Sequence, residues 1–106
     1  MNRIMSDTEL KAQVYVRLRQ LGYKAQMNVR LPLYSSVKGY KVIVVDVLVR
    51  DRDDNILALF YIGRMKARKE IKYKMLKIKI FFILNEDNMN NMIRLFNEYA
   101  AKRFYK

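Results

Sequence analysis

The chain contains no cysteine and no histidine, and this absence removes several classes of chemistry. A zinc finger, a thiol nucleophile, a Ser-His-Asp triad and imidazole acid–base catalysis are all impossible within these residues. A bound metal would have to be a hard cation such as Mg²⁺ or Mn²⁺, held by carboxylate and backbone oxygens. Because there is neither cysteine nor a recognisable secretory signal, we expect a cytoplasmic protein.

Glycine, proline and long apolar runs are also scarce. Three glycines and one proline leave no GxxxxGK[ST] or GxGxxG sequence, so a phosphate-cradling loop is not expected. The apolar runs fall well short of the roughly 20 residues that span a bilayer, so we expect no membrane partner. A chain of 106 residues with 52% hydrophobic residues predicts a single folded domain over residues 1–106.

Positive charge is abundant and unevenly distributed. The chain has 22 Lys and Arg against ten Asp and Glu, a net charge of +12. Such a field attracts polyanions, although high charge also keeps a protein soluble. The distribution favours a polyanion partner, because half of the sixteen residues from 64 to 79 are basic and Glu70 alone opposes them. The predicted nucleic-acid-binding residues are Arg64, Lys66, Arg68, Lys69, Lys72, Lys74, Lys77 and Lys79.

Hydrophobic periodicity and turn residues predict an α/β fold. Ser6 and Glu9 form a capping box before apolar residues at helical spacing, and Gly22 supplies a C-terminal cap. Pro32 is expected to stop the first strand, and the strand over 40–50 is expected to be buried on both faces. The pattern predicts a helix at 7–21, strands at 23–31, 40–50 and 56–62, a helix at 65–76, a strand at 77–84 and a final helix from Met89.

Asp46 stands out because its neighbours in the strand are all apolar. Burying an unpaired carboxylate costs several kcal/mol, so Asp46 needs a cation, a metal or hydrogen-bond donors. A turn around Asp53 and Asp54 would place it opposite Phe60 or Tyr61 on the next strand. Two interpretations stay open: a structural Asp satisfied by a Lys, Arg or Tyr hydroxyl, and a metal ligand at the sheet edge.

The order α-β-β-β-α-β-α, with Val45-Asp46, the run Leu59 to Gly63 and the run Lys79 to Asn85, resembles the PD-(D/E)XK nuclease superfamily. The likeness is to the N-terminal nuclease domain of type I restriction motor subunits and to archaeal Holliday-junction resolvases. It spans most of the chain, from Thr8 to about Tyr99. It implies a restriction-endonuclease-like core, a mixed sheet flanked by helices.

The resemblance also implies a site in which a helix Glu, a strand Asp and a (D/E)-X-K triplet bind a divalent metal and activate water. Glu9 and Asp46 match the first two, although Glu9 is also explained by the capping box. The triplet falls on Tyr61-Ile62-Gly63, which lacks both the carboxylate and the lysine. A relocated site could use Glu70 with Lys66, a pair that helix salt bridging also explains.

The sequence therefore predicts a nucleic-acid-binding protein, for DNA in particular, with a nuclease-like fold, a degenerate site and no required cofactor. One alternative is an active Mg²⁺- or Mn²⁺-dependent endonuclease or junction resolvase with relocated catalytic residues. Another is an interaction or inhibitory factor that forms a homodimer through its apolar strand or its final helix.

Overall fold

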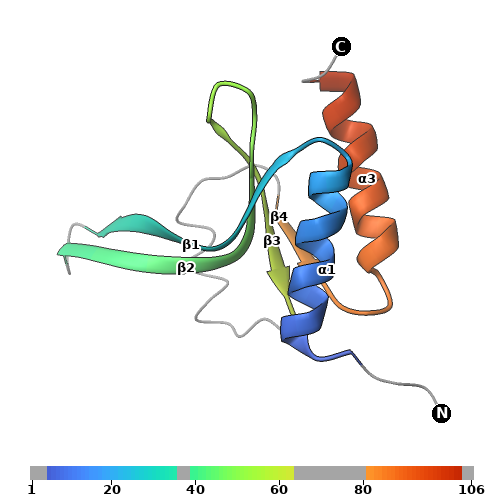
Figure 1. The fold of residues 1–106 in the computed structure, drawn as a ribbon. Coiled ribbons are helices and arrows are strands. Elements are labelled where there is room, and N and C mark those ends of the chain that lie inside the picture. Colours follow the sequence, from blue (N-terminus) through green and yellow to red (C-terminus); the bar gives the residue numbers. More distant parts are fainter. Residues whose placement is uncertain (1–4, 36–38, 64–80, 104–106) are drawn as a thin grey trace.

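The computed structural model describes residues 5–35, 39–63 and 81–103. They form α1 (Asp7–Gln20), β1 (Lys24–Ser35), β2 (Gly39–Arg50), β3 (Ile56–Ile62), β4 (Phe81–Leu84) and α3 (Met89–Arg103). The strands make one sheet in the order β1-β2-β3-β4, antiparallel except for the parallel pair β3 and β4 (Figure 1). The predicted α/β class with a mixed sheet is confirmed. The predicted helix at 65–76 and residues 77–80 of the last predicted strand lie outside the described residues.

Helix α1 begins and ends where the sequence predicts. The Ser6 hydroxyl accepts a hydrogen bond from the Glu9 backbone N–H at 3.2 Å, which caps the first turn. At the other end, the N–H groups of Gly22 and Tyr23 bond back to the carbonyls of Arg19 and Leu18. Gly22 has φ +95°, so this is a Schellman ending, which turns the chain directly into β1.

The first strand does not stop at Pro32, and that prediction was wrong. β1 continues to Ser35, and Pro32 pairs with Val42 of β2. The reason is that β1 is an edge strand, with β2 as its one neighbour in the described sheet. On an edge strand the missing N–H of proline can face away from the partner, where no ladder hydrogen bond is lost.

The β1–β2 hairpin changes face part-way along its length. Near its base, the register pair Ala25 and Val49 belongs to the core beneath the helices. Further out, Val29 and Val45 pair in the same register but pack in the cluster on the opposite face of the sheet. In a regular strand, side chains alternate between the two faces, so odd-numbered residues would all lie on one face. Because these odd-numbered pairs lie on opposite faces, the alternation of side chains shifts by one residue between them. The slip falls at Asn28, which has φ +54°, and at Asp46.

Beyond the slip, the hairpin projects from the body as a two-stranded ribbon (Figure 1). We call this ribbon the arm and define it as Val29–Ser35 of β1 and Gly39–Val45 of β2. The prediction that residues 40–50 are buried on both faces was wrong for the arm, since Val42 is 57% and Val44 42% exposed. It holds from Val47 to Val49, where β2 lies between β1 and β3.

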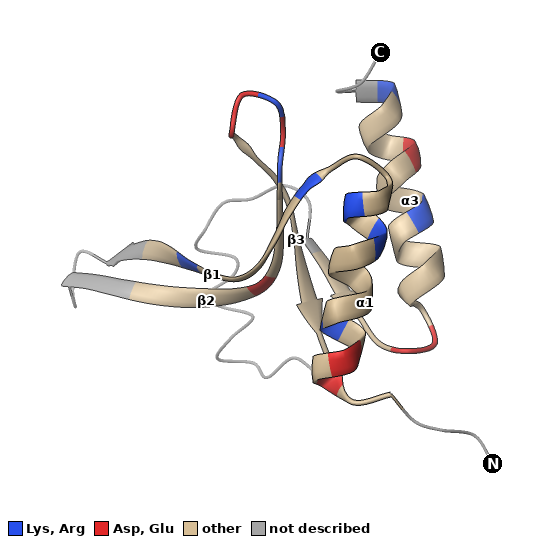
Figure 2. Ribbon diagram, in the orientation of Figure 1, with Lys and Arg blue, Asp and Glu red and all other residues tan. Residues whose placement is uncertain are grey.

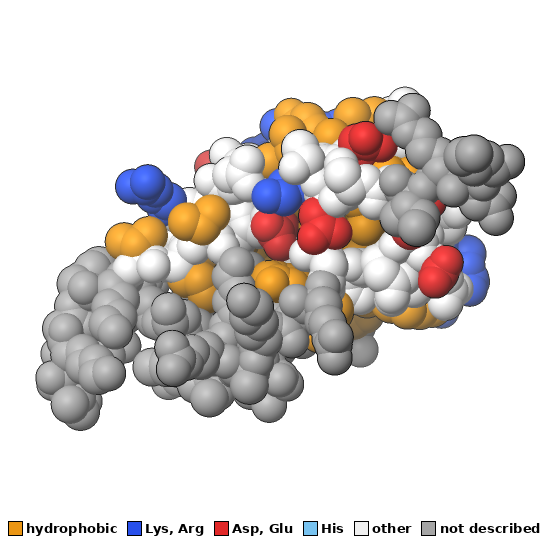
Figure 3. Space-filling model, turned by 90° about the horizontal axis from the view of Figure 1, so that it is seen from below, with side chains coloured by type: hydrophobic (Ala, Val, Ile, Leu, Met, Phe, Trp, Pro, Cys, Tyr) orange, Lys and Arg blue, Asp and Glu red, His pale blue; other side chains and the backbone are white. Residues whose placement is uncertain are grey.

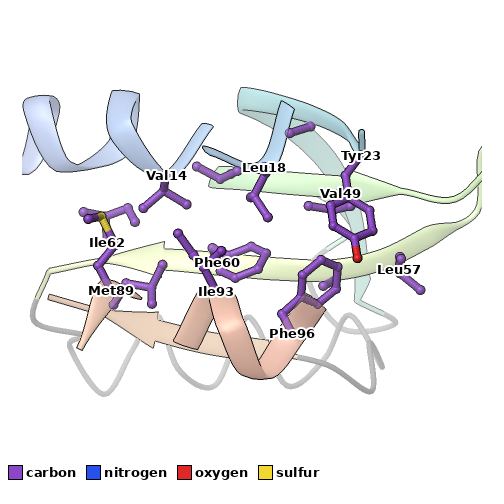
Figure 4. Packing of buried hydrophobic residues seen from close by; sticks show 14 of the residues in the cluster. Val14, Leu18, Tyr23, Val49, Leu57, Phe60, Ile62, Met89, Ile93 and Phe96 are labelled. Carbon is purple, nitrogen blue, oxygen red and sulfur yellow. The ribbon is translucent and has the colours of Figure 1, made fainter. Parts of the chain in front are cut away.

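The main core lies between the two described helices and one face of the sheet (Figure 4). Phe60 of β3 sits at its centre, with its ring 5.4 Å edge-on from Phe96 of α3 and 5.1 Å from the stacked ring of Phe82. Tyr23 joins the aromatic cluster at 5.0 Å from Phe96, and its hydroxyl donates to the Asn97 side chain at 2.7 Å. The core residues of the helices are Leu10, Val14, Leu18, Met89, Ile93, Phe96 and Ala100.

The opposite face of the sheet carries a second, smaller apolar cluster. Its buried members are Leu31, Ile43, Val45, Leu48, Leu59 and Tyr61. All six come from strands, so the described helices cover one face of the sheet. Among the described residues, no helix is long and apolar enough to cross a membrane.

A partly buried carboxylate at the root of the arm

Asp46 lies at the point where β2 leaves β3. The pairing of these strands ends at Val47 and Phe60, and Asp46 is the next residue of β2 toward the arm. Its carboxylate then accepts a hydrogen bond from the Ile62 N–H, with Oδ2 at 3.0 Å from the nitrogen. The side chain thus takes the place of the backbone acceptor that β2 would provide if it continued alongside β3. Asp46 therefore belongs to the hydrogen-bonding system of the sheet.

The other oxygen of Asp46 is paired with a cation from helix α1. Lys11 Nζ lies 3.0 Å from Asp46 Oδ1, with side-chain exposures of 23% and 15%. The same ammonium group donates to Asn28 Oδ1 at 2.8 Å. Asn28 and Asp46 both lie between the register pairs Met27–Val47 and Val29–Val45, and the lysine contacts both. Lys11 therefore ties the first helix to the point where the arm leaves the sheet.

A second carboxylate, that of Asp7, lies near this group. Asp7 is in the first turn of α1, and a Cβ built on Gly63 would come within 2.9 Å of its Oδ2. Burial raises the pKa of the Tyr61 hydroxyl, and the negative charges of Asp46 and Asp7 raise it further. Figure 3 shows acidic side chains gathered beside a basic one on the face seen from below.

Gly63 offers a direct test of this packing. Its φ is +94° and its Cα faces Asp7, whereas Gly22 has almost the same φ, +95°, with no atom within 4 Å of a built Cβ. We expect Gly22→Ala to cost about 1–2 kcal/mol of unfolding free energy for the left-handed conformation. Gly63→Ala should cost about 2–3 kcal/mol, because Asp7 must also move. Urea denaturation of both variants measures the difference.

The double variant Gly63→Ala/Asp7→Ala is the control for that comparison. If the Asp7 carboxylate causes the extra loss, its removal should return Gly63→Ala to the level of Gly22→Ala. Equal losses for the two single glycine variants would show that Asp7 moves aside without cost.

The geometry favours the structural interpretation of Asp46. Both of its oxygens are engaged, one by an ammonium group and one by a backbone N–H. Within the described ranges, no group of three or more acidic side chains could hold a metal ion. A hard cation here would have to compete with Lys11 for the carboxylate. The group is an ion pair in which the Asp46 carboxylate also accepts from the Ile62 N–H and the Lys11 ammonium also donates to Asn28 Oδ1.

Some of the predicted site residues lie near Asp46, one lies in the cap of α1, and the others fall outside the described residues. Tyr61 lies near the end of β3, where the charge of Asp46 acts on its hydroxyl, and Gly63 follows the strand directly. The Glu9 backbone takes part in the capping of α1, and its side chain is exposed. Glu70, Lys66 and the other predicted nucleic-acid-binding residues at 64–79 lie outside the described residues.

Lys11, Asp7 and Asn28 are the residues that the sequence interpretation missed. Lys11 follows Asp7 by four residues, an ordinary helix spacing that gives no indication of a long-range partner. A signal did exist for Asn28, because asparagine tolerates positive φ and an Asn inside a predicted strand can mark an irregularity. That irregularity lies directly opposite Asp46.

The described sheet and helices carry both acidic and basic residues (Figure 2). The described residues hold nine of the ten acidic residues but eleven of the 22 basic ones, a net charge of +2. The remaining net charge of +10 belongs to the other residues, and +7 of it falls within 64–79. Two of the described ion pairs, Lys24–Asp54 and Arg94–Glu98, also lie at the surface. The described sheet and helices are therefore nearly neutral.

Comparison of the chain with family models, curated proteins and solved structures finds no match.

Proposed function

We propose that this protein binds nucleic acid and does so without cutting it. The observation that carries the proposal is the separation of charge, with a nearly neutral described scaffold and a net +7 within sixteen residues. A charge that served only solubility would need no such concentration. Basic residues gathered in one segment are the usual electrostatic footprint of a polyanion partner.

The described residues that flank this segment support a defined place for it. Ile62 ends β3 and Phe81 begins β4, and these strands are parallel neighbours. The Gly63 N–H also donates to the Leu84 carbonyl at 2.8 Å, which joins the two strand ends. The described residues on both sides of the basic segment thus belong to neighbouring strands of one sheet.

We further propose that the fold is a degenerate PD-(D/E)XK-type core. The proposal is supported by a helix followed by three antiparallel strands, a fourth strand parallel to the third and a final helix, while the helix expected at 65–76 lies outside the described residues. The absence of cleavage follows from the chemistry at the end of β3. Tyr61 and Gly63 offer neither carboxylate nor amine, and the Asp46 carboxylate is already paired with Lys11.

One experiment tests both parts of the proposal. Purified protein is incubated with labelled duplex, four-way junction and single-stranded DNA and with RNA, with and without Mn²⁺, and both binding and cleavage are scored. We expect binding that weakens with salt, no cleavage, and no change in melting temperature with Mn²⁺.

Two results would contradict the proposal. Absence of binding to every probe at low salt would remove the nucleic-acid function. Mn²⁺-dependent cleavage that Asp46→Asn abolishes, together with Mn²⁺ stabilisation of the parent protein, would establish the alternative, an active endonuclease.

A further inference from the structure

The exposed face of the arm combines apolar side chains with a cation. In the register of the hairpin, Arg30 pairs with Val44 and Pro32 with Val42, and alternate pairs lie on the same face of the ribbon. All four residues are exposed, with Val42 at 57% and Val44 at 42%. The other face of the ribbon belongs to the second apolar cluster. The arm therefore presents one face to solvent while the opposite face anchors it.

The next pair outward in the register is aromatic. Tyr34 pairs with Tyr40, two positions beyond Pro32 and Val42 in the backbone register. From Arg30 to Ser35 the strand spans about 17 Å at roughly 3.3 Å per residue. That length accommodates several nucleotides along the face.

Charge on the arm is of one sign. The sequence has no acidic residue between Glu9 and Asp46, so the charged residues of the arm strands are Arg30 and Lys41. Figure 2 shows the described cation on the β1 side of the arm, and Figure 3 shows hydrophobic side chains reaching the surface on the same side of the molecule as the arm. The partner that fits this face is therefore negatively charged and also has apolar surface to bury.

We infer that the exposed face of the arm binds single-stranded nucleic acid, with unpaired bases against Pro32, Val42 and Val44. This inference rests on the proposed function and specifies its substrate. Unpaired bases expose apolar faces that stack on aromatic and apolar side chains, whereas a duplex keeps those faces inside its stack. Arg30 supplies the phosphate contact beside them. A face that bound only duplex phosphates would gain nothing from exposed valines.

The test measures affinity for single-stranded and duplex DNA of equal length as a function of salt. Val42→Thr/Val44→Thr keeps the β-branched side chains that suit a strand, and we expect about a three- to tenfold loss of single-strand affinity with an unchanged salt slope. Arg30→Gln should reduce the log–log slope by about 0.7, because it removes one phosphate contact on a single strand.

Matched controls come from the other side of the molecule. Val16 on α1 is 47% exposed, so Val16→Thr makes the same chemical change away from the arm. Lys102→Gln removes one exposed charge from α3, as Arg30→Gln does from the arm. Both controls should retain the parent affinity for single strands to within about twofold.

Three outcomes would overturn the inference. Equal or tighter binding of duplex, or single-strand affinity that survives Val42→Thr/Val44→Thr, would remove the bases from this face. A parent protein that is dimeric in size-exclusion chromatography, and monomeric after Val42→Thr/Val44→Thr with DNA affinity intact, would make the face a dimer interface. A parent protein that binds no nucleic acid would instead contradict the proposed function itself.

Discussion

Asp46→Ala should lower the unfolding free energy by about 2–4 kcal/mol, the largest stability effect that we expect from any surface-accessible side chain here. The substitution removes the acceptor of the Ile62 N–H, which belongs to a buried residue, and the partner of the Lys11 ammonium. Lys11 keeps only its 2.8 Å bond to Asn28 Oδ1 in this cluster. Urea denaturation with an unchanged m value is the measurement.

Conservative variants separate the two contacts of Asp46. Asp46→Asn keeps an oxygen for the Ile62 N–H but removes the ion pair, so we expect it to lose about half as much stability as Asp46→Ala. Lys11→Met leaves the carboxylate with the single backbone donor. The loss of unfolding free energy in the double variant Lys11→Met/Asp46→Asn should be smaller than the sum of the losses in the two single variants.

The control for this series is Glu98→Gln. Glu98 pairs with Arg94 at 3.1 Å, about the same distance as in the Lys11–Asp46 pair, but with side-chain exposures of 61% and 56%. An exposed i, i+4 pair contributes about 0.3–0.5 kcal/mol. If Asp46→Ala cost no more than Glu98→Gln, or raised stability, the structural interpretation of Asp46 would be wrong. The functional interpretation, in which Asp46 is a strained carboxylate, would then be favoured.

Replacing Lys66, Lys69, Lys72 and Lys74 with Gln should reduce the affinity for duplex DNA by about 100-fold at low salt, and flatten its salt dependence. Each phosphate contact contributes about 0.9 to the log–log slope, so the slope should fall by up to about 3.6 if all four lysines contact phosphates. Fluorescence anisotropy over a series of salt concentrations measures both quantities. The proposed function predicts the effect, since these lysines carry much of the charge that the scaffold lacks.

A variant with equal charge removed elsewhere distinguishes direct contact from the general field. Arg17, Lys24, Arg94 and Lys102 are all exposed on the described scaffold, and changing them to Gln also lowers the net charge by four. We expect a smaller loss of affinity and a nearly unchanged slope. Equal effects from the two quadruple variants would mean that net charge attracts the nucleic acid, without phosphate contacts from the segment at 64–79.

Much of the fold could be predicted from local sequence. The capping box at Ser6 and Glu9, the helical spacing that follows and the turn at Gly22 each act over a few residues, so their geometry can be inferred without the rest of the chain. The hairpin between β2 and β3 was predicted for the same reason. Its turn is closed by the Asp51 carboxylate, which accepts from the backbone N–H groups of Asp53 and Asn55.

Predictions that depended on neighbouring strands were less successful. The continuation of β1 past Pro32 required knowledge that β1 is an edge strand, and the exposure of Val42 and Val44 required knowledge that β2 extends beyond β3. Neither fact can be read from the residues themselves, because β-strand environment is set by what pairs on each side.

The charge, the excluded chemistries, the α/β class and the need of Asp46 for a partner could all be inferred from the amino-acid sequence. A carboxylate among apolar neighbours requires a compensating partner in any fold, because the cost of desolvation is a property of the group. The identity of that partner, Lys11, 35 positions away in sequence, and the change of face of the hairpin at Asn28 and Asp46 became known from the folded arrangement. Long-range pairing depends on how helix and sheet pack together, and many lysines in this chain would have satisfied the same local requirement.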